Sequence, residues 1–213
     1  MIVAVVRFPG SLDHESAARA VKDAGGEPVE AWHGEAALPS GTEAVVVPGG
    51  FSYGDHLRPG AIASRSAVMA DVSRHAERGG RVLGICNCFQ FLGETGLLPG
   101  ALRTNSALSF VCRQVDLEVS DPSTPWTGGQ RGPDRLSIPV KNHDGAWFGD
   151  PEGTRVVLRY VDDPHGSTDR VAGVANDAGN LLGLKPHPEE PRDPLLGSTD
   201  GRHLFRGLLG AAA

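Results

Sequence analysis

Residues 81–92 constrain this chain most, because they read as a buried strand, a tight turn and then a helix. The first part is apolar and strand-forming, Gly84 marks a close backbone approach, and phenylalanine and leucine recur after the turn. Cys86 is therefore expected at the bend, beside the positive end of the following helix, where a thiolate is favoured over a thiol. A catalytic nucleophile is presented in this way, but this stretch alone is equally compatible with an inert buried cysteine.

Other apolar runs in the first half predict further strands of a parallel sheet. Residues 2–8 and 44–47 are almost uninterrupted apolar runs, as in central strands that are buried on both faces. A shorter strand is expected at residues 28–33, and helices are expected at residues 13–24 and 61–78, each closed by a glycine pair. Alternating strands and helices of this kind predict an α/β fold with an open, mostly parallel sheet and flanking helices.

The pattern changes after residue 100 and predicts an antiparallel extension of the sheet. A hairpin turn is expected at residues 176–180, a loop at 121–134, and a last helix from Asp200 through Leu209 that packs back onto the sheet. The strands expected here are residues 108–119, 135–140, Arg155–Tyr160, Val171–Ala175 and Leu181–Leu184. With no linker-like segment between the two halves, residues 1–213 are predicted to form a single domain.

Charge and cysteine content narrow the class of protein. A net charge of -6 and a pI near 5.7 argue against nucleic acid or an anionic membrane as the main partner. The chain enters a strand at once and has no apolar run near the roughly 18 residues of a membrane span, so we expect a cytoplasmic protein. Cys86, Cys88 and Cys112 suit a reducing compartment, and without a second pair of ligands at zinc spacing no metal site is predicted.

A loop rich in small residues follows the predicted strand at residues 44–47. Residues 48–55 read Pro-Gly-Gly-Phe-Ser-Tyr-Gly-Asp, a composition that lets backbone amides come close to a neighbour, although ordinary glycine-rich turns look the same. Loops at the carboxyl ends of parallel strands form the ligand-binding edge of open α/β sheets, and this loop and Cys86 are expected to share that edge. We therefore favour a functional loop.

One histidine stands out as a partner for a nucleophilic cysteine. His187 follows a predicted strand directly, and the prolines on either side of it restrict the backbone so that Glu189 is expected on the same side as the imidazole. A base held by a carboxylate is the arrangement that a nucleophile needs. Without Cys86, a rigid surface turn would be the better interpretation. The histidines at positions 14, 33, 56, 75, 165 and 203 lie in polar stretches and are expected at the surface.

Two motifs together resemble the class I (triad) glutamine amidotransferases: Gly84-Ile85-Cys86-Asn87-Cys88-Phe89-Gln90 and Pro186-His187-Pro188-Glu189. Further motifs are similar to the glutaminase subunits of phosphoribosylformylglycinamidine synthase, and this likeness runs from end to end. They are Phe8-Pro9-Gly10-Ser11, Pro48-Gly49-Gly50-Phe51-Ser52-Tyr53-Gly54-Asp55, Gly96-Leu97-Leu98-Pro99-Gly100-Ala101-Leu102-Arg103 and Leu196-Gly197-Ser198-Thr199-Asp200-Gly201.

The resemblance implies roles for individual residues. Cys86 would attack the side-chain amide carbon of glutamine, His187 would act as general base and acid, and Glu189 would orient the imidazole. The backbone amides of Gly50 and Asn87 would hold the oxyanion. Contacts to the amino-acid end of glutamine would come from Gln90 and residues 105–110, including Asn105 and Phe110.

The resemblance also implies a fold, partners and cofactors. The fold would be the flavodoxin-like sheet of class I glutamine amidotransferases. Ammonia would pass to a large synthetase subunit that converts phosphoribosylformylglycinamide to phosphoribosylformylglycinamidine, in a complex with a small bridging subunit. This chain would hold no cofactor, and the synthetase would bind ATP and Mg²⁺. In agreement, the sequence has no Gly-x-x-x-x-Gly-Lys-Ser/Thr phosphate loop.

The sequence departs from the family pattern in two places. Cys88 stands where glycine is usual, and we expect the small thiol to be tolerated with a slightly altered oxyanion hole and, under oxidation, a possible cross-link to Cys86. Asn142, His143 and Asp144 stand where the family commonly has a histidine, a glycine and an acidic residue near the active site. Alternatives are a glutaminase subunit of another amidotransferase complex, a redox sensor using Cys86 and Cys88, or a non-catalytic interaction subunit.

Overall fold

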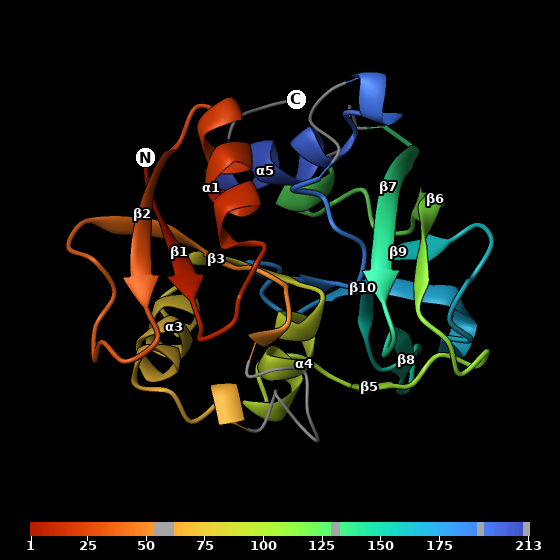
Figure 1. Ribbon diagram of the computed structural model, residues 1–213, viewed down its shortest axis with the longest axis horizontal. Helices are drawn as coiled ribbons and strands as arrows, with labels where there is room; N and C mark the ends of the chain where they lie inside the picture. Colours follow the sequence, from red (N-terminus) through yellow and green to blue (C-terminus); the bar gives the residue numbers. More distant parts are fainter. Residues whose placement is uncertain (53–61, 129–132, 191–193, 211–213) are drawn as a thin grey trace.

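The computed structural model describes residues 1–52, 62–128, 133–190 and 194–210, and these residues are built around a nine-stranded sheet (Figure 1). The sheet is parallel from β2 to β11, and from β11 to β7 each strand runs antiparallel to its neighbour. Its strands lie in the order β2 (Glu27–Trp32), β1 (Ile2–Arg7), β3 (Thr42–Val47), β4 (Arg81–Ile85), β11 (Leu181–Leu184), β10 (Val171–Ala175), β9 (Arg155–Tyr160), β6 (Val111–Val119) and β7 (Arg135–Asn142).

The central strands are buried on both faces. In β1, Val3 and Val5 belong to one hydrophobic cluster, whereas Ala4 and Val6 belong to a second cluster on the opposite face. This alternation follows from the two-residue period of a strand, which turns successive side chains to opposite sides. Both faces of the sheet must therefore be covered.

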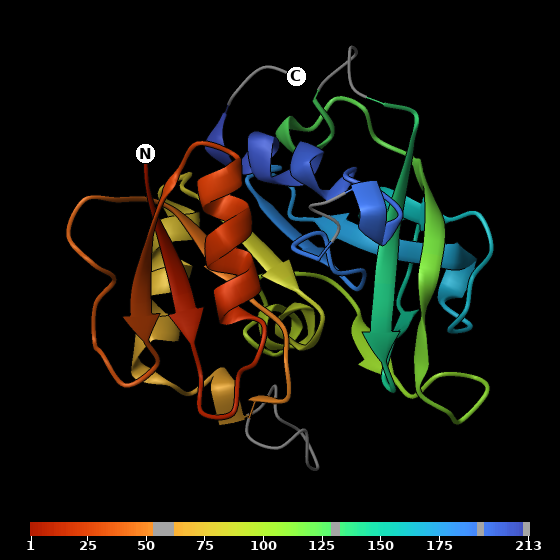
Figure 2. The same cartoon turned by 45° about the horizontal axis from the view of Figure 1, so that its top comes forward.

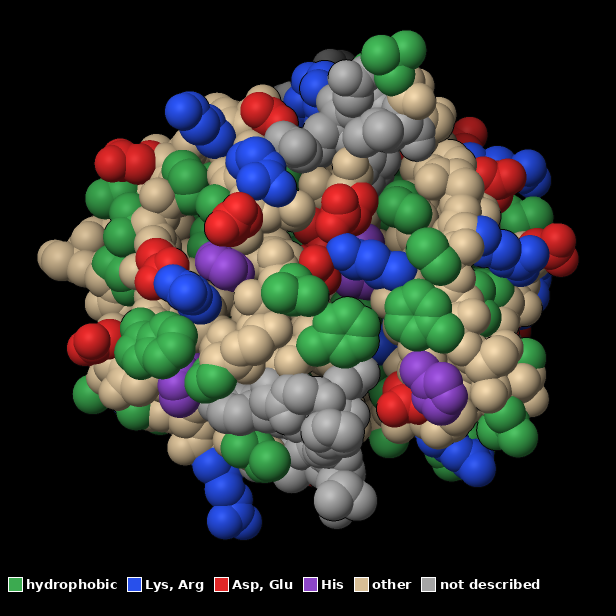
Figure 3. Space-filling model, in the orientation of Figure 1, with side chains coloured by type: hydrophobic (Ala, Val, Ile, Leu, Met, Phe, Trp, Pro, Cys, Tyr) green, Lys and Arg blue, Asp and Glu red, His purple; other side chains and the backbone are tan. Residues whose placement is uncertain are grey.

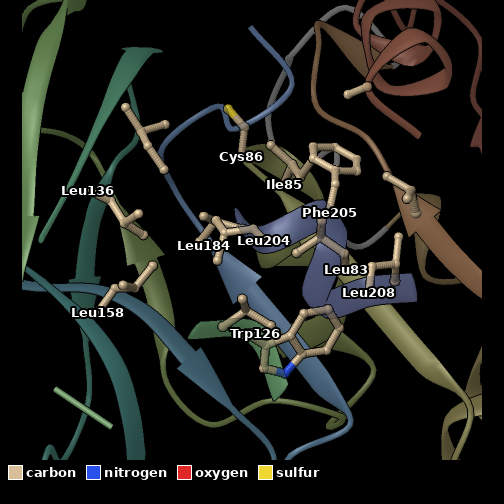
Figure 4. Close-up of a cluster of buried hydrophobic side chains, with 14 of the residues drawn as sticks. Leu83, Ile85, Cys86, Trp126, Leu136, Leu158, Leu184, Leu204, Phe205 and Leu208 are labelled. Carbon is tan, nitrogen blue, oxygen red and sulfur yellow. The ribbon is translucent and has the colours of Figure 1, made fainter. Parts of the chain in front are cut away.

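Helices cover the two faces. α1 (His14–Asp23) and α5 (Gly201–Leu209) lie together on one side, as Figures 1 and 2 both show. Figure 4 shows leucine and aromatic side chains from α5 and from several strands meeting in the cluster on this side, with Cys86 at one end of it. The other cluster contains apolar side chains of α3 (Ala67–Glu77) and α4 (Asn87–Glu94). The predicted α/β class, with an open sheet, flanking helices and an antiparallel second half, is confirmed.

Short elements complete the described part of the chain. β5 (Ala101–Arg103) and β8 (Ala146–Phe148) pair antiparallel as a separate small sheet. The 3-10 helices whose bounds lie within the described residues are η2 (Pro125–Thr127), η4 (Thr168–Arg170) and η5 (Pro194–Leu196). No helix among the described residues is long and apolar enough to cross a membrane. That residues 1–213 form one domain stays a prediction.

Most element boundaries agree with the sequence-based expectations, and the differences are local. The strands at Arg155–Tyr160, Val171–Ala175 and Leu181–Leu184 are confirmed residue for residue, with the predicted hairpin turn between the last two. The helix expected at residues 61–78 is interrupted, because residues 62 and 63 are helical, residues 64–66 form a turn and bend, and α3 begins at Ala67. β6 begins at Val111, later than expected, and Leu108 before it has a positive φ of 51°, which is uncommon for a residue with a side chain. β5 and β8 were not predicted.

Candidate active site

Cys86 lies at the sharp bend between β4 and α4. Its backbone amide donates to the Leu184 carbonyl at 2.9 Å, which continues the pairing of β4 with β11. Its φ of 56° and ψ of -115° are strained for a residue with a side chain, as at the elbow that presents a nucleophile. The close approach predicted at Gly84 is confirmed, because a Cβ there would lie 2.3 Å from a methyl carbon of Leu92 on α4. The bend therefore depends on tight helix-on-strand packing.

His187 and Glu189 lie in the loop that follows β11, the strand next to β4. The predicted contact between them is confirmed: His187 Nδ1 is 2.7 Å from Glu189 Oε1. Both side chains are almost completely buried, with exposed fractions of 1% and 0%. A carboxylate bonded to Nδ1 leaves Nε2 to exchange protons with a substrate or with the nearby Cys86.

The charges at this edge of the sheet favour a thiolate and an imidazolium. Burial raises the pKa of the Cys86 thiol, but the positive charges of Lys185 and His187 lower it by a larger amount. The pKa therefore falls below its ordinary value of 9.0. Burial lowers the pKa of His187, yet the Cys86 and Glu189 charges raise it to about 10. Both shifts favour the ionised forms, a thiolate at Cys86 and an imidazolium at His187.

Three charged residues that the sequence did not suggest adjoin this pair. Asp13, at the start of α1, has Oδ2 at 3.5 Å from His187 Nδ1, and its Oδ1 accepts from Lys141 Nζ at 2.8 Å. Lys141 also binds Glu190 Oε1 at 2.7 Å. Near the middle of the face drawn in Figure 3, acidic, basic and histidine side chains adjoin one another. This network ties α1, β7 and the loop after β11 together around the imidazole.

A metal ion at this cluster is a weaker interpretation than a proton-transfer site. Asp13, His187 and Glu189 each offer an atom, and these atoms lie within 4.8 Å of one another. However, the Nδ1 atom of the histidine is already bonded to the glutamate, and Lys141 neutralises the aspartate. The arrangement thus suits a held imidazolium.

The loop after β3 packs directly against the bend. A Cβ at Gly49 would lie 2.8 Å from Cys86 Cβ and 3.1 Å from His187 Cε1, so only glycine fits. Gly50 has a positive φ of 103°, and its carbonyl accepts from Asn87 Nδ2 at 3.1 Å and from the Ser52 amide at 2.7 Å. That the backbone amides of Gly50 and Asn87 bind the oxyanion stays a prediction. Tyr53, Gly54 and Asp55 lie outside the described residues.

Cys88 sits in the core on the opposite side of the sheet from Cys86. Its thiol donates to the Pro48 carbonyl at 2.7 Å, and burial together with the nearby Cys86 charge raises its pKa well above 9.0. Both cysteines are free, and they belong to different hydrophobic clusters. Cys88 is therefore a neutral hydrogen-bond donor at the base of the Gly49–Gly50 loop, which argues against a redox pair.

The predicted substrate-binding residues are less clearly placed. Gln90, on α4, is half-buried and lines a pocket of about 340 Å³ that is formed with residues of α4 and β5. Phe110 is 51% exposed. Asn105 is fully buried and committed within the protein: Nδ2 donates to the Ser109 and Asn142 carbonyls and Oδ1 accepts from the Gly145 amide. Direct contacts of these residues with glutamine stay predictions, and the bonds of Asn105 suit a residue that shapes the loops.

The segment at residues 142–144 divides between core and surface. Asn142 is buried, and His143 is exposed with its Nδ1 at 3.2 Å from Asp144 Oδ1.

The expectation that the remaining histidines lie at the surface is wrong for His75 and His165. Their side chains are buried, with exposed fractions of 8% and 0%, because tertiary packing covers their polar sequence neighbourhoods. His56 lies outside the described residues.

His165 should make the fold sensitive to acid. Burial, followed by the charges of Lys185 and Arg113, lowers the pKa of His165 from 6.5 to about 3. Between these two pH values the unfolded chain binds a proton that the folded chain does not, so stability falls as the pH falls from 6.5 toward 3. Replacing His165 with phenylalanine should remove this part of the acid sensitivity, up to about 5 kcal/mol in all at 1.36 kcal/mol per unit.

Denaturant unfolding of His165→Phe at pH 7 and pH 5 measures this effect, with the exposed His143→Phe as control. A stability loss between the two pH values that is as large in His165→Phe as in the wild type would contradict the assignment.

Comparisons with known proteins identify relatives along the whole chain. Residues 1–201 match the family described as the CobB/CobQ-like glutamine amidotransferase domain. The protein named phosphoribosylformylglycinamidine synthase subunit PurQ from Rubrobacter xylanophilus is 49% identical over 219 residues, covering 100% of this chain and 99% of the relative. The protein of the same name from Cereibacter sphaeroides is 48% identical over 220 residues, with 100% and 99% covered.

Solved structures agree in fold. A chain in the structure of PurLQS from Thermotoga maritima superposes with a TM-score of 0.91 at 41% identity, covering 98% of this chain and 97% of that one. A protein described as a putative GMP synthase subunit, from Thermoplasma acidophilum, superposes with a TM-score of 0.68 at 16% identity. The match covers 99% of this chain and 92% of that one, and it shows a shared fold alone.

Proposed function

Because the chain belongs to the CobB/CobQ-like glutamine amidotransferase family, we propose that it is the glutaminase subunit of a phosphoribosylformylglycinamidine synthase. The relatives at 49% and 48% identity carry that name, and both are matched over nearly their whole length. The chain hydrolyses glutamine and supplies ammonia for the conversion of phosphoribosylformylglycinamide in purine biosynthesis. The resemblance noted in the sequence is confirmed.

The chain works in a complex. The Thermotoga maritima structure is described as PurLQS, and the chain in it that matches ours is similar at a TM-score of 0.91. Accordingly, the partners are a large synthetase subunit and a small bridging subunit. We further propose that ATP and Mg²⁺ are bound by the synthetase, that this chain carries no cofactor, and that the complex is cytoplasmic.

The observation that carries the mechanism is the buried Glu189 carboxylate bonded to His187 at 2.7 Å, with Cys86 and the imidazole packed against the same loop at Gly49. The pKa shifts of Cys86 and His187 favour a thiolate and an imidazolium. In the first step the thiolate attacks the amide carbon of glutamine and forms a C–S bond. The tetrahedral oxyanion lies at the amino end of α4, where the Asn87 amide and the Gly50 amide are proposed to hold it. His187 donates its proton to the leaving nitrogen, and ammonia departs from a thioester.

In the second step the neutral imidazole removes a proton from water, and the water oxygen attacks the thioester carbon. The C–S bond breaks, glutamate leaves, and the sulfur recovers its charge beside the reprotonated imidazole. Glu189 and Asp13 stabilise the imidazolium in the states in which His187 holds its proton, because both carboxylates lie next to Nδ1.

Reconstitution of the three-subunit complex tests which molecule accepts the ammonia. The chain is combined with the large and small subunits from the same organism, ATP, Mg²⁺ and glutamine labelled with ¹⁵N in the side-chain amide. We expect the label to enter phosphoribosylformylglycinamidine, and free ammonium at high concentration should replace glutamine. Hydrolysis of glutamine without transfer of nitrogen to this acceptor would point to a glutaminase that serves another amidotransferase complex.

A further inference from the structure

Lys185 lies beside the nucleophile because of strand register. β4 and β11 are parallel neighbours with Leu184 opposite Ile85, so the next residue of each strand, Lys185 and Cys86, leaves the sheet at the same edge. Two backbone bonds fix this position: the Cys86 amide donates to the Leu184 carbonyl, and the Lys185 amide donates to the Ala172 carbonyl on β10. The lysine is therefore held where the thiolate forms.

The side-chain nitrogen of Lys185 is buried next to the sulfur of Cys86. The lysine is 2% exposed, and Nζ lies 3.6 Å from Cys86 Sγ. Within the described part of the chain, no carboxylate forms an ion pair with it within 4.0 Å. A buried ammonium is costly unless an anion is close. The geometry is therefore that expected of a buried ammonium group whose charge is balanced by an ionised Cys86.

We propose that Lys185 is a further catalytic residue, a second cation that stabilises the Cys86 thiolate in the resting enzyme and again when the sulfur leaves the thioester. This inference rests on the proposed glutaminase function and adds a residue to it. His187 must give up its proton during the reaction, whereas the lysine next to the sulfur needs to transfer none.

The two chemical steps are affected differently. A cation beside the sulfur stabilises the thiolate before attack, which makes it less reactive toward the amide carbon. When the thioester forms, the negative charge leaves the sulfur and Lys185 remains buried beside a neutral atom. Breaking the C–S bond restores the charge, so the lysine favours the hydrolysis step. Its removal should slow hydrolysis of the thioester more than its formation.

Other titratable groups also face the sulfur and the ammonium group, and they are unchanged in the test below. They are Asp13 before α1, Cys88 on α4, Tyr160 on β9, His165 in the loop after β9, and His187 and Glu189 after β11.

The first test is the pH dependence of Cys86 alkylation by iodoacetamide, followed by intact mass, with and without Lys185→Met in a Cys112→Ser background, because Cys112 is exposed and would be alkylated as well. Methionine keeps the length of the side chain and removes the charge. The midpoint of the alkylation profile should move upward by about one pH unit. Lys22→Met, which removes an exposed lysine from α1, is the matched control and should leave the midpoint unchanged.

The second readout is the fraction of enzyme present as thioester during turnover of glutamine, measured by acid quench and intact mass. This fraction should rise in Lys185→Met. A folded variant with an unchanged alkylation midpoint would overturn the proposal. If Lys185→Met does not fold, Lys185→Gln removes the charge while keeping a hydrogen-bond donor, and the same comparison decides. Alkylation needs no glutamine, so its outcome is separate from that of the glutaminase assay.

Discussion

Replacing Cys86 with serine should lower glutamine hydrolysis by at least about 10⁴-fold, because it removes the nucleophile of a unit whose members act together. The hydroxyl of serine does not ionise near neutral pH, so the nearby cations that favour a thiolate cannot activate it. Ammonia release in the reconstituted complex measures the loss. Intact mass after exposure to a glutamine-like electrophile should show one label on the wild type and none on Cys86→Ser.

The other cysteines supply the controls for this experiment. Cys112 is exposed on β6 and Cys88 is buried with a raised pKa, so labelling should persist in Cys112→Ser and in Cys88→Ser. Excess glutamine should block it. Labelling that survives in Cys86→Ser, or a wild type that takes no label even with its synthetase present, would remove the catalytic assignment and favour a non-catalytic interaction subunit.

Adding one methyl group at Gly49 should lower kcat by about 100-fold or more. The new Cβ would lie 2.8 Å from Cys86 Cβ and 3.1 Å from both His187 Cε1 and Asp13 Oδ2, so the loop, the nucleophile or the imidazole must move. Displacements of about 1 Å between reacting groups have effects of this size. Glutamine hydrolysis at saturating substrate measures it, and circular dichroism confirms that Gly49→Ala is folded.

Gly34→Ala is the matched control for this change. Gly34 is exposed, and its new Cβ would meet the exposed Trp32 side chain at 3.3 Å, which can move aside. The control should keep wild-type activity. A folded Gly49→Ala with wild-type kcat would show that the loop does not need to touch the bend for catalysis.

Elements whose signals are local could be predicted from the sequence. Leu181–Leu184 is an apolar run bounded by a turn and a proline, and the structure ends the strand at the same residues. β5 and β8 have three residues each, too few for a periodic signal. Their pairing accompanies the packing of Trp147 over Gly100, where a Cβ would lie 2.4 Å from the indole nitrogen. Contacts of this kind join residues that are distant in the sequence, so no local sequence pattern predicts them.

The same distinction separates the residues of the active site. Cys86, His187 and Glu189 could be identified because each carries a local signal, a strand-to-helix turn or a proline-flanked histidine with a nearby carboxylate. Lys185, Asp13 and Lys141 carry none. Lys185 adjoins Cys86 only because β11 is inserted next to β4, and Lys141 reaches Asp13 across 128 positions of sequence. The order of strands in the sheet decides these contacts.

The strained bend at Cys86 sets function against stability. A φ of 56° with a ψ of -115° costs of the order of 1–3 kcal/mol for a residue with a Cβ, whereas glycine adopts such angles readily. Under selection for stability alone, glycine would be the favoured residue at this position. The cysteine at this position is needed for catalysis and lowers the stability of the folded chain. Thermal resistance would therefore have to be raised by stabilising changes elsewhere in the chain, which leave the activity intact.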